Sequence, residues 1–279
     1  MAKTAKVYYN VVMDKKRTRT REIFRGMKIF LAILVFVGAI GFMLWDVNRS
    51  ENGGNQAGSA NELVIGTDPG FKPFEYKEGS TTVGFDIDLA RNIALEQNKT
   101  LRVEEMVFDG LLLALQSGRI DLAIAGMTKT AERAQNVDFS IPYYNAAQMI
   151  IVQKGSTIRG EADLVGRKIG VQLGTTGDDL AHKIREAKVV QLPQTANVMQ
   201  ELNAGRIDAA IMDNGPATQY LANNPKLKML ENELSVEEYA IAVKKGNAEL
   251  LQQVNRSIKN MKKDGRYAML VKKYFGEKK

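Results

Sequence analysis

The sequence predicts an α/β protein with two related lobes, preceded by one membrane-spanning helix. Three observations support this: an uncharged apolar run at residues 29–45, strand-like runs that alternate with helical patterns beyond residue 62, and an internal repeat spaced by 87 residues. With 279 residues, 44% of them hydrophobic and 25% charged, the chain has the length and composition of one or two globular domains.

The N-terminal segment, residues 1–28, is strongly basic. Its nine Lys and Arg side chains, set against Asp14 and Glu22, account for the whole net charge of +7. The remaining residues sum to zero, so they offer no broad basic surface for a nucleic-acid backbone.

An apolar run, IFLAILVFVGAIGFMLW, occupies residues 29–45. As a helix at ~1.5 Å per residue it is about 25 Å long, enough for a thin bilayer, and it lacks the polar face of a buried core helix. The nearest small-x-small cleavage site, at residues 58–60, lies well beyond it. We therefore expect an uncleaved signal-anchor in the cytoplasmic membrane, with residues 1–28 inside and the rest on the periplasmic or cell-surface side.

The chain contains no cysteine, so no disulfide, thiolate metal site or lipid-modified cysteine can form. Residues 46–61, DVNRSENGGNQAGSAN, are rich in Gly, Asn and Ser and predict a flexible tether. Its r.m.s. reach is about 22 Å.

Beyond the tether, short apolar runs alternate with helical patterns. The patterns predict strands at 63–66, 101–107 and 121–125, and helices at 86–97 and 109–117. This βαβα order predicts a mainly parallel sheet.

The internal repeat joins two distant parts of the chain. Residues 115–124, LQSGRIDLAI, match residues 202–211, LNAGRIDAAI, with eight identities or near-identities in ten positions. In each copy a Gly can cap a helix in the left-handed conformation and an Asp opens a buried strand. Chance similarity of two helix-to-strand joints is the alternative to related lobes. Gly126 and Asp213 follow the two strands at equivalent places, and ligands bind beyond the carboxyl ends of strands, so both are candidates for a site between lobes.

Four segments carry side chains suited to a ligand: 67–75, TDPGFKPFE; 125–133, AGMTKTAER; 170–177, GVQLGTTG; and 212–216, MDNGP. Together they offer an Arg and helix N-terminal amides for a carboxylate, an Asp for an ammonium, and aromatic rings for a side chain. That set suits an α-amino acid zwitterion. Alone, each segment is a weak indication, because an Arg is usually solvated and a Gly-rich turn is usually only a turn.

In their order, the motifs TDPGFKPFEY, VGFDIDLA, GLLLALQSGRIDLAIAGMTKTAER, VDFSIPYY, GVQLGTTGDDLA and GRIDAAIMD resemble the family-3 solute-binding proteins for polar amino acids. That family includes glutamine-binding and lysine/arginine/ornithine-binding periplasmic receptors, and the resemblance covers residues 62–279. It implies the type II periplasmic-binding-protein fold, two α/β lobes joined by crossing strands near 146–151 and 239–243. Lobe 1 would comprise residues 62–147 and 240–279, and lobe 2 residues 148–239.

The resemblance implies which residues hold the ligand backbone. Arg133 would pair with the α-carboxylate, assisted by the backbone N–H groups of Thr128 and Thr176. Asp213 would bind the α-ammonium, together with the Gly126 carbonyl and the Thr128 hydroxyl.

It also implies a side-chain pocket, in which Phe71 and Phe108 sandwich the ligand while Asp68 and Gln172 contact its polar tip. Glutamine receptors of the family typically have Lys at the position of Gln172, and that cation would repel a basic ligand. With a neutral residue there and a carboxylate nearby, we expect arginine or lysine first, glutamine or histidine second, and acidic amino acids last.

The function implied is amino-acid capture by hinge closure and delivery to the permease and ATPase subunits of an ABC importer, with no catalytic residue, metal or cofactor. Two alternatives stay open: an enzyme like cyclohexadienyl dehydratase, which shares the fold, and the sensory domain of a signalling system. Glu75 either adds negative charge to the pocket or is structural. His182 and the Lys-rich segment 259–279 are expected to be solvated.

Overall fold

The computed structural model describes residues 61–276. The predicted basic tail and membrane anchor, and all of the tether except Asn61, lie outside the described residues. Within residues 61–276, no helix combines the length and apolar character needed to cross a membrane. The chain divides into two units, Met1–Asn55 and Gln56–Lys279, and the described residues all belong to the second.

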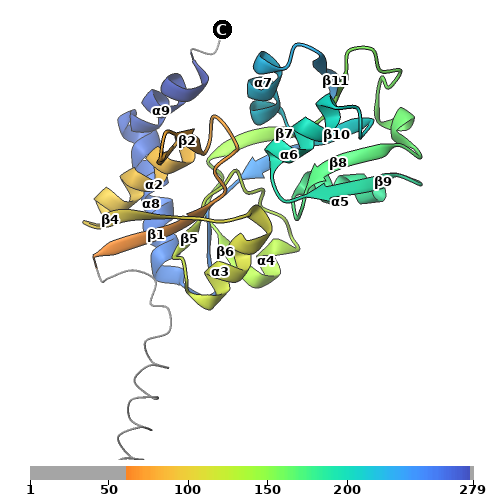
Figure 1. The fold of residues 1–279 in the computed structure, drawn as a ribbon. Coiled ribbons are helices and arrows are strands. Elements are labelled where there is room, and N and C mark those ends of the chain that lie inside the picture. The colour runs from red at the N-terminus through yellow and green to blue at the C-terminus, as the bar shows by residue number, and fades with distance from the viewer. Residues whose placement is uncertain (1–60, 277–279) are drawn as a thin grey trace, which may run out of the picture. The chain divides into compact units, whose positions relative to one another are not determined.

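Two five-stranded sheets form the framework of this unit (Figure 1). The first contains β1 (Glu62–Thr67), β4 (Thr100–Glu105), β5 (Leu122–Ala123), β6 (Val137–Phe139) and β12 (Ala242–Lys244). The second contains β7 (Tyr144–Gln153), β8 (Lys168–Gln172), β9 (Lys188–Leu192), β10 (Ala209–Asp213) and β11 (Leu227–Tyr239). Their orders are β4-β1-β5-β12-β6 and β11-β7-β10-β8-β9, and a separate hairpin pairs β2 (Tyr76–Glu78) with β3 (Thr81–Val83).

The helices lie on the faces of these sheets. They are α2 (Phe85–Glu96), α3 (Leu111–Ser117), α4 (Arg133–Asn136), α5 (Thr176–Lys183), α6 (Thr195–Asn203), α7 (Asn214–Asn223), α8 (Ala248–Asp264) and α9 (Arg266–Phe275), with 3-10 turns η1 (Phe108–Gly110) and η2 (Glu161–Leu164). The predicted elements correspond to β1, α2, β4, α3 and β5, although the strand expected at 121–125 is only two residues long. The helix expected from 109 begins as the turn η1, so α3 starts two residues later.

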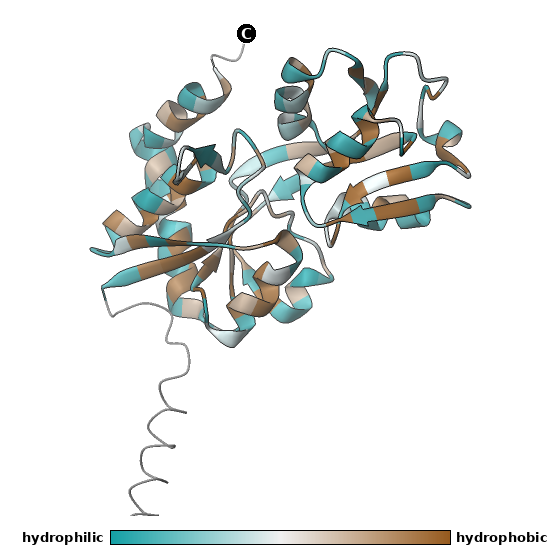
Figure 2. Cartoon of the chain, viewed as in Figure 1, coloured by the Kyte–Doolittle hydropathy of each residue, from teal (hydrophilic) through white to brown (hydrophobic). Residues whose placement is uncertain are grey.

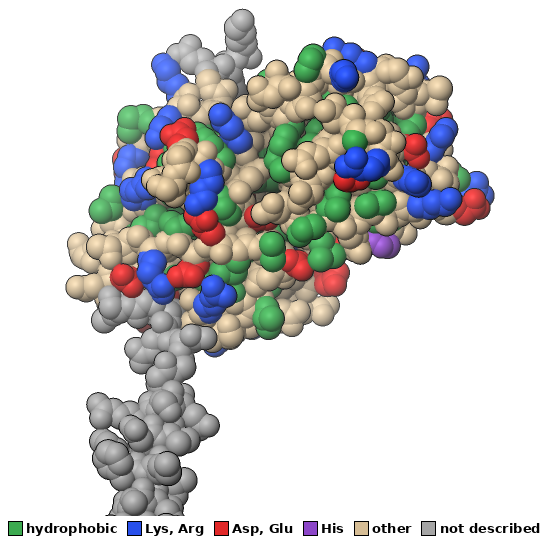
Figure 3. Space-filling model, viewed as in Figure 1, with side chains coloured by type: hydrophobic (Ala, Val, Ile, Leu, Met, Phe, Trp, Pro, Cys, Tyr) green, Lys and Arg blue, Asp and Glu red, His purple; other side chains and the backbone are tan. Residues whose placement is uncertain are grey.

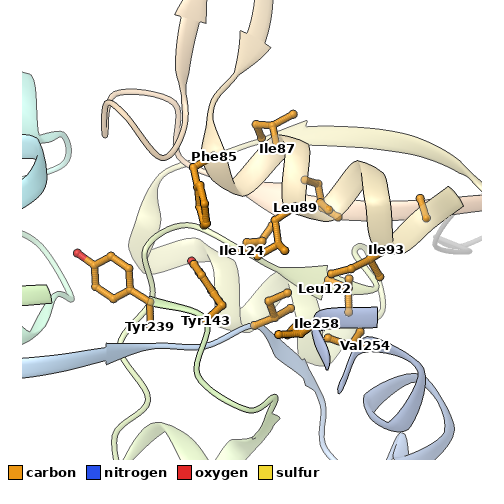
Figure 4. Close-up of a cluster of buried hydrophobic side chains, with 14 of the residues drawn as sticks. Phe85, Ile87, Leu89, Ile93, Leu122, Ile124, Tyr143, Tyr239, Val254 and Ile258 are labelled. Carbon is orange, nitrogen blue, oxygen red and sulfur yellow. The ribbon is translucent and has the colours of Figure 1, made fainter. Parts of the chain in front are cut away.

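Both faces of the first sheet are buried, and its residues alternate between them. Leu63 and Ile65 pack into a cluster with α2 and α8, part of which Figure 4 shows, whereas Val64 packs with α3 on the opposite face. Side chains along a strand point alternately to the two faces, so each short apolar run supplies two cores.

The second sheet is built in the same way. Met149 and Ile151 of β7 face the cluster around α6 and α7, while Ile150 and Val152 face the cluster around α5 and η2. Figure 2 shows the result as hydrophobic colour concentrated along the strands of both sheets.

The repeated sequence builds the same joint in both sheets. Asp121 accepts a hydrogen bond from the backbone N–H of Val64 at 2.9 Å, and Asp208 accepts one from Lys168 at 2.8 Å. In each case the Asp backbone N–H also donates to the carbonyl of the same partner residue. Each Asp therefore ties the start of one strand to its parallel neighbour, as the shared motif requires.

The chain passes between the sheets twice, after β6 and after β11. The two passages lie side by side, because the backbone N–H of Tyr143 donates to the carbonyl of Tyr239, and that of Ser140 to Ile241, both at 2.9 Å. The crossing expected at 146–151 falls inside β7, within the second sheet. The paired passages fix how segments 62–139 and 144–239 face one another.

Two leucines on α2 provide a matched test of the core. Leu89 is fully buried, whereas Leu95 is 65% exposed. Leu89→Ala should lower the free energy of unfolding by about 2–5 kcal/mol, since it leaves a cavity. Leu95→Ala should change it by no more than about 0.5 kcal/mol. Urea denaturation of residues 56–279 measures both, and equal effects of the two substitutions would contradict this packing.

Candidate ligand-binding site

A partly enclosed cavity lies between the two sheets, and all nine residues predicted for the site line it. These are Asp68, Phe71, Phe108, Gly126, Thr128, Arg133, Gln172, Thr176 and Asp213. Strand topology explains the convergence: β1, β5, β8 and β10 each end at or just before a lining residue, so their carboxyl ends meet at one place.

Arg133, at the start of α4, connects the two sides of the cavity. Its guanidinium donates to the carbonyl of Thr128 at 2.7 Å and, across the cavity, to that of Gly174 at 2.9 Å. It also lies over the ring of Phe108, 5.3 Å from its centroid. A guanidinium has five N–H donors in a planar fork, so two such bonds leave donors for an anion in the cavity.

The N-terminus of α5 lies on the same side as Gly174. Thr175 caps the helix by accepting from the backbone N–H of Asp178 at 3.3 Å, and both Thr175 and Thr176 line the cavity. The partial positive charge of a helix N-terminus therefore adds to that of Arg133. Together they make this end of the cavity suitable for a carboxylate.

Asp213 is the last residue of β10 and is 7% exposed. Its Oδ1 accepts a hydrogen bond from the hydroxyl of Tyr239 at 2.6 Å. Burial raises the pKa of Asp213 to about 7, although the bond from Tyr239 opposes the shift. A cationic group in the cavity would favour its ionised form.

Asp68 and Gln172 meet from opposite sheets. The Gln172 amide donates to Asp68 at 2.6 Å, and the backbone N–H of Phe108 donates to the same carboxylate at 3.2 Å. The amide oxygen of Gln172 accepts from the Thr195 hydroxyl at 2.7 Å, which fixes its orientation. Burial raises the pKa of Asp68 to about 6, the two hydrogen bonds limiting the shift.

Gly126 occupies a place where only glycine fits. Its φ is +54°, and a Cβ there would lie 2.6 Å from the ring of Phe71. Its backbone N–H donates to the carboxylate of Asp86 at 2.8 Å, which ties the turn to α2. The bare backbone therefore borders the cavity directly, and Phe71 can pack against it.

Several lining residues were not predicted as ligand contacts. Glu75, which the sequence left between a charged and a structural role, lies at the cavity with 1% exposure. Thr195 follows β9, and the rule that sites lie beyond strand carboxyl ends could have indicated it. Tyr239 is not itself among the lining residues; its hydroxyl donates to Asp213, 26 residues away, a contact for which no local signal exists.

His182 does not line the cavity; its side chain is 55% exposed and lies 3.0 Å from Asp178. Residues 61–276 contain no group of His, Cys, Asp and Glu arranged to hold a metal ion.

Two sheets joined by paired crossings, with a polar cavity at their strand ends, define a solute-binding protein of the type II periplasmic-binding-protein fold. The chain belongs to the bacterial extracellular solute-binding proteins, family 3, whose model matches residues 63–277. The arginine-binding extracellular protein ArtP of Bacillus subtilis is 37% identical over 259 residues, which is 90% of this chain and 100% of the relative.

Solved structures give the same result. An ancestral arginine-binding protein bound to arginine matches with a TM-score of 0.75 and 44% identity, covering 77% of this chain and 99% of that one. The arginine-, lysine-, histidine-binding protein ArtJ of Geobacillus stearothermophilus matches with a TM-score of 0.75 and 37% identity, covering 78% and 96%. The chain is thus a substrate-binding protein for polar amino acids and not an enzyme, so the dehydratase alternative is set aside.

The raised pKa of Asp213 predicts how binding depends on pH. Below about pH 7 the ligand-free carboxyl is protonated, and it must lose its proton before it pairs with an ammonium. The affinity for glutamine, whose side chain is neutral, should therefore fall as pH decreases from about 8 to about 5.5, approaching tenfold per unit. Calorimetric titration with glutamine at several pH values tests this. Asp213→Asn is the control, because the residual affinity of this variant should no longer depend on pH in this way. Constant wild-type affinity across this range would contradict it.

Proposed function

We propose that this protein captures arginine, or another basic amino acid, outside the cytoplasmic membrane and delivers it to an ABC importer. The observation that carries the proposal is the charge of the cavity. Three buried carboxyl groups line it, those of Asp68, Glu75 and Asp213, and among its described lining residues Arg133 is the one cation. The α-carboxylate and α-ammonium of an amino acid pair with Arg133 and with one of the three carboxyl groups. The other two carboxyl groups then favour a ligand whose side chain carries a second positive charge.

In this proposal Arg133 and the N-terminus of α5 hold the α-carboxylate, and Asp213 holds the α-ammonium. The backbone of Gly126 and Thr128 borders the ammonium. Phe71 provides an apolar wall for the ligand stem. Phe108, whose ring faces the guanidinium of Arg133, contributes to the same wall while it orients that side chain.

Capture works by closure of two lobes, residues 62–147 with 240–279 and residues 148–239. Hydrogen bonds between the two sides support a closed arrangement: Arg133 to Gly174, Gln172 to Asp68, and the Tyr220 hydroxyl to the Gly70 carbonyl at 2.9 Å. A ligand that contacts both sides stabilises this arrangement over an open one. The closed form is then the state presented to the permease and its ATPase.

The relatives support this ligand, since several are named for arginine binding. The face of the molecule in Figure 3 does not suggest a nucleic-acid partner instead. On the face that Figure 3 shows, Lys and Arg side chains are interspersed with Asp and Glu.

Removal of either end of the zwitterion clamp tests the site. Arg133→Ala and Asp213→Ala should each weaken arginine binding by about 2–5 kcal/mol, because each leaves a ligand charge unpaired in a closed cavity. Arg206→Ala is the matched control, since its side chain is 62% exposed and pairs with Glu201 at the surface, away from the cavity lining. Calorimetry on the wild type should give the highest affinity for arginine, a lower one for glutamine and the lowest for glutamate. Tighter binding of glutamate than of arginine would refute the argument from the charge of the cavity.

The anchor is tested separately. If residues 29–45 remain as an uncleaved helix, the full chain should fractionate with membranes, and a chain that starts at residue 56 should be released. Peptide sequencing of the mature N-terminus gives the decisive reading. A freely soluble mature protein beginning near Asn61 would overturn the anchor and leave the binding site unaffected.

A further inference from the structure

Helix α7, in the lobe formed by residues 148–239, contacts the turn at residues 70–74 of the other lobe. The hydroxyl of Tyr220 donates to the carbonyl of Gly70 at 2.9 Å, although the two residues are 150 positions apart in the sequence. At the start of the helix, Gly215 lies so close to the ring of Phe74 that a Cβ there would be 3.1 Å from it. The helix therefore meets the turn at two points.

The contact of α7 is separate from the contacts that a ligand makes. Neither Tyr220 nor Gly215 is among the residues that line the cavity, whereas Gly70 is. By contrast, Arg133 and Gln172, which donate the other hydrogen bonds named above between the two sides, both line it. An amino acid in the cavity competes for the donors of those two side chains, but it does not compete for the Tyr220 hydroxyl.

Both sides of the contact are fixed within their own lobes. In the turn, the backbone N–H of Phe74 donates to the carbonyl of Phe71 at 2.9 Å, and the N–H of Phe85, at the start of α2, donates to the carbonyl of Pro73 at 3.0 Å. In α7, Ala217 is fully buried and belongs to the core cluster around α6 and α7. Since neither side can follow the other, separation of the two lobes breaks the contact.

The Tyr220 hydroxyl remains a hydrogen-bond donor over a wide range of pH. Burial raises the pKa of Tyr220 to about 12, and the charge of Asp68 adds to this shift. The backbone carbonyl of Gly70 has no proton to lose and accepts throughout this range. The hydrogen bond between them therefore depends on the distance between the lobes and not on ionisation.

We propose that Tyr220 is a latch, a positioning residue that stabilises the closed arrangement of the lobes by the same amount whichever amino acid is bound. The proposal rests on the proposed function and separates the strength of closure from the choice of ligand. The apparent affinity of a ligand depends on how favourable the closed state is, so the latch raises every affinity by one common factor. Because a ligand leaves after the lobes open, the latch slows dissociation and leaves association unchanged.

Tyr220→Phe tests the latch, because it removes the hydroxyl and keeps the ring. The affinities for arginine and for glutamine should fall by the same factor, about two- to tenfold, which is the contribution of one hydrogen bond. The dissociation rates should rise by that factor. Calorimetry measures the affinities and stopped-flow tyrosine fluorescence the rates. Tyr76→Phe is the matched control and should change neither, since the Tyr76 hydroxyl donates to Glu78 within its own hairpin.

Gly215→Ala tests the other point of contact. The ring of Phe74 is fully buried and packs edge-on against Phe85, so it has little room to move away from an added Cβ. The substitution should therefore also weaken arginine and glutamine binding by one common factor. Alanine has the higher helix propensity, so the thermal unfolding midpoint of this variant should not fall.

Unchanged affinities in Tyr220→Phe, a loss confined to one of the two amino acids, or slower association in place of faster dissociation would overturn the latch. Tighter binding by Gly215→Ala would also overturn it. A wild type that binds glutamine but not arginine would refute the proposed preference for basic ligands, and the effect of Tyr220→Phe on glutamine would still decide the latch. A wild type that binds no amino acid would refute the proposed function, and the latch with it.

Discussion

The cavity is organised around one guanidinium in the midst of buried carboxyl groups. Arg133 donates to carbonyls on both sides, so the same side chain holds the sides together and carries the positive charge of the site. Opposite it, Asp213 and Asp68 are buried with their pKa values raised to about 7 and about 6. Burial of carboxyl groups without matching cations disfavours their ionised forms, and a cationic ligand offsets this cost by pairing with them.

This charge arrangement depends on the topology. Parallel strands of each sheet deliver polar residues to their carboxyl ends, and the paired crossings turn those ends toward one another. The Gly126 turn and the Gly174 turn bring bare backbone to the site; a Cβ at Gly174 would lie 3.1 Å from the Cβ of Asp109, across the cavity. The close approach of the sides therefore depends on glycine where the lobes meet.

Much of this could be predicted from the sequence. The repeat located equivalent joints, and Asp121 and Asp208 do make the same strand-linking hydrogen bonds. The motifs placed all nine candidate residues, which line one cavity. Local patterns suffice here because each candidate follows its own strand directly.

The rest depends on contacts between distant residues, which a single sequence does not reveal. The buried pairing of the Glu75 and Asp86 carboxyl groups depends on how α2 packs beside the turn after β1, and no local pattern reports that. The Lys-rich terminal segment was expected to be solvated, yet Phe275 of α9 stacks on Tyr144 at 4.9 Å, beside the crossing. In the same helix Lys273 and Tyr274 both donate to Asp88 of α2, at 2.7 and 2.6 Å, and only the fold shows these partners.

The central claim is that one cavity grips the two charged ends of an amino acid between Arg133 and Asp213. A crystal structure of residues 56–279 grown with arginine tests it most directly. The account predicts the ligand carboxylate within hydrogen-bond distance of the Arg133 guanidinium and the α-ammonium against the Asp213 carboxylate, with both sides of the cavity in contact with the ligand. A ligand bound in the reverse orientation, or bound outside this cavity, would contradict it.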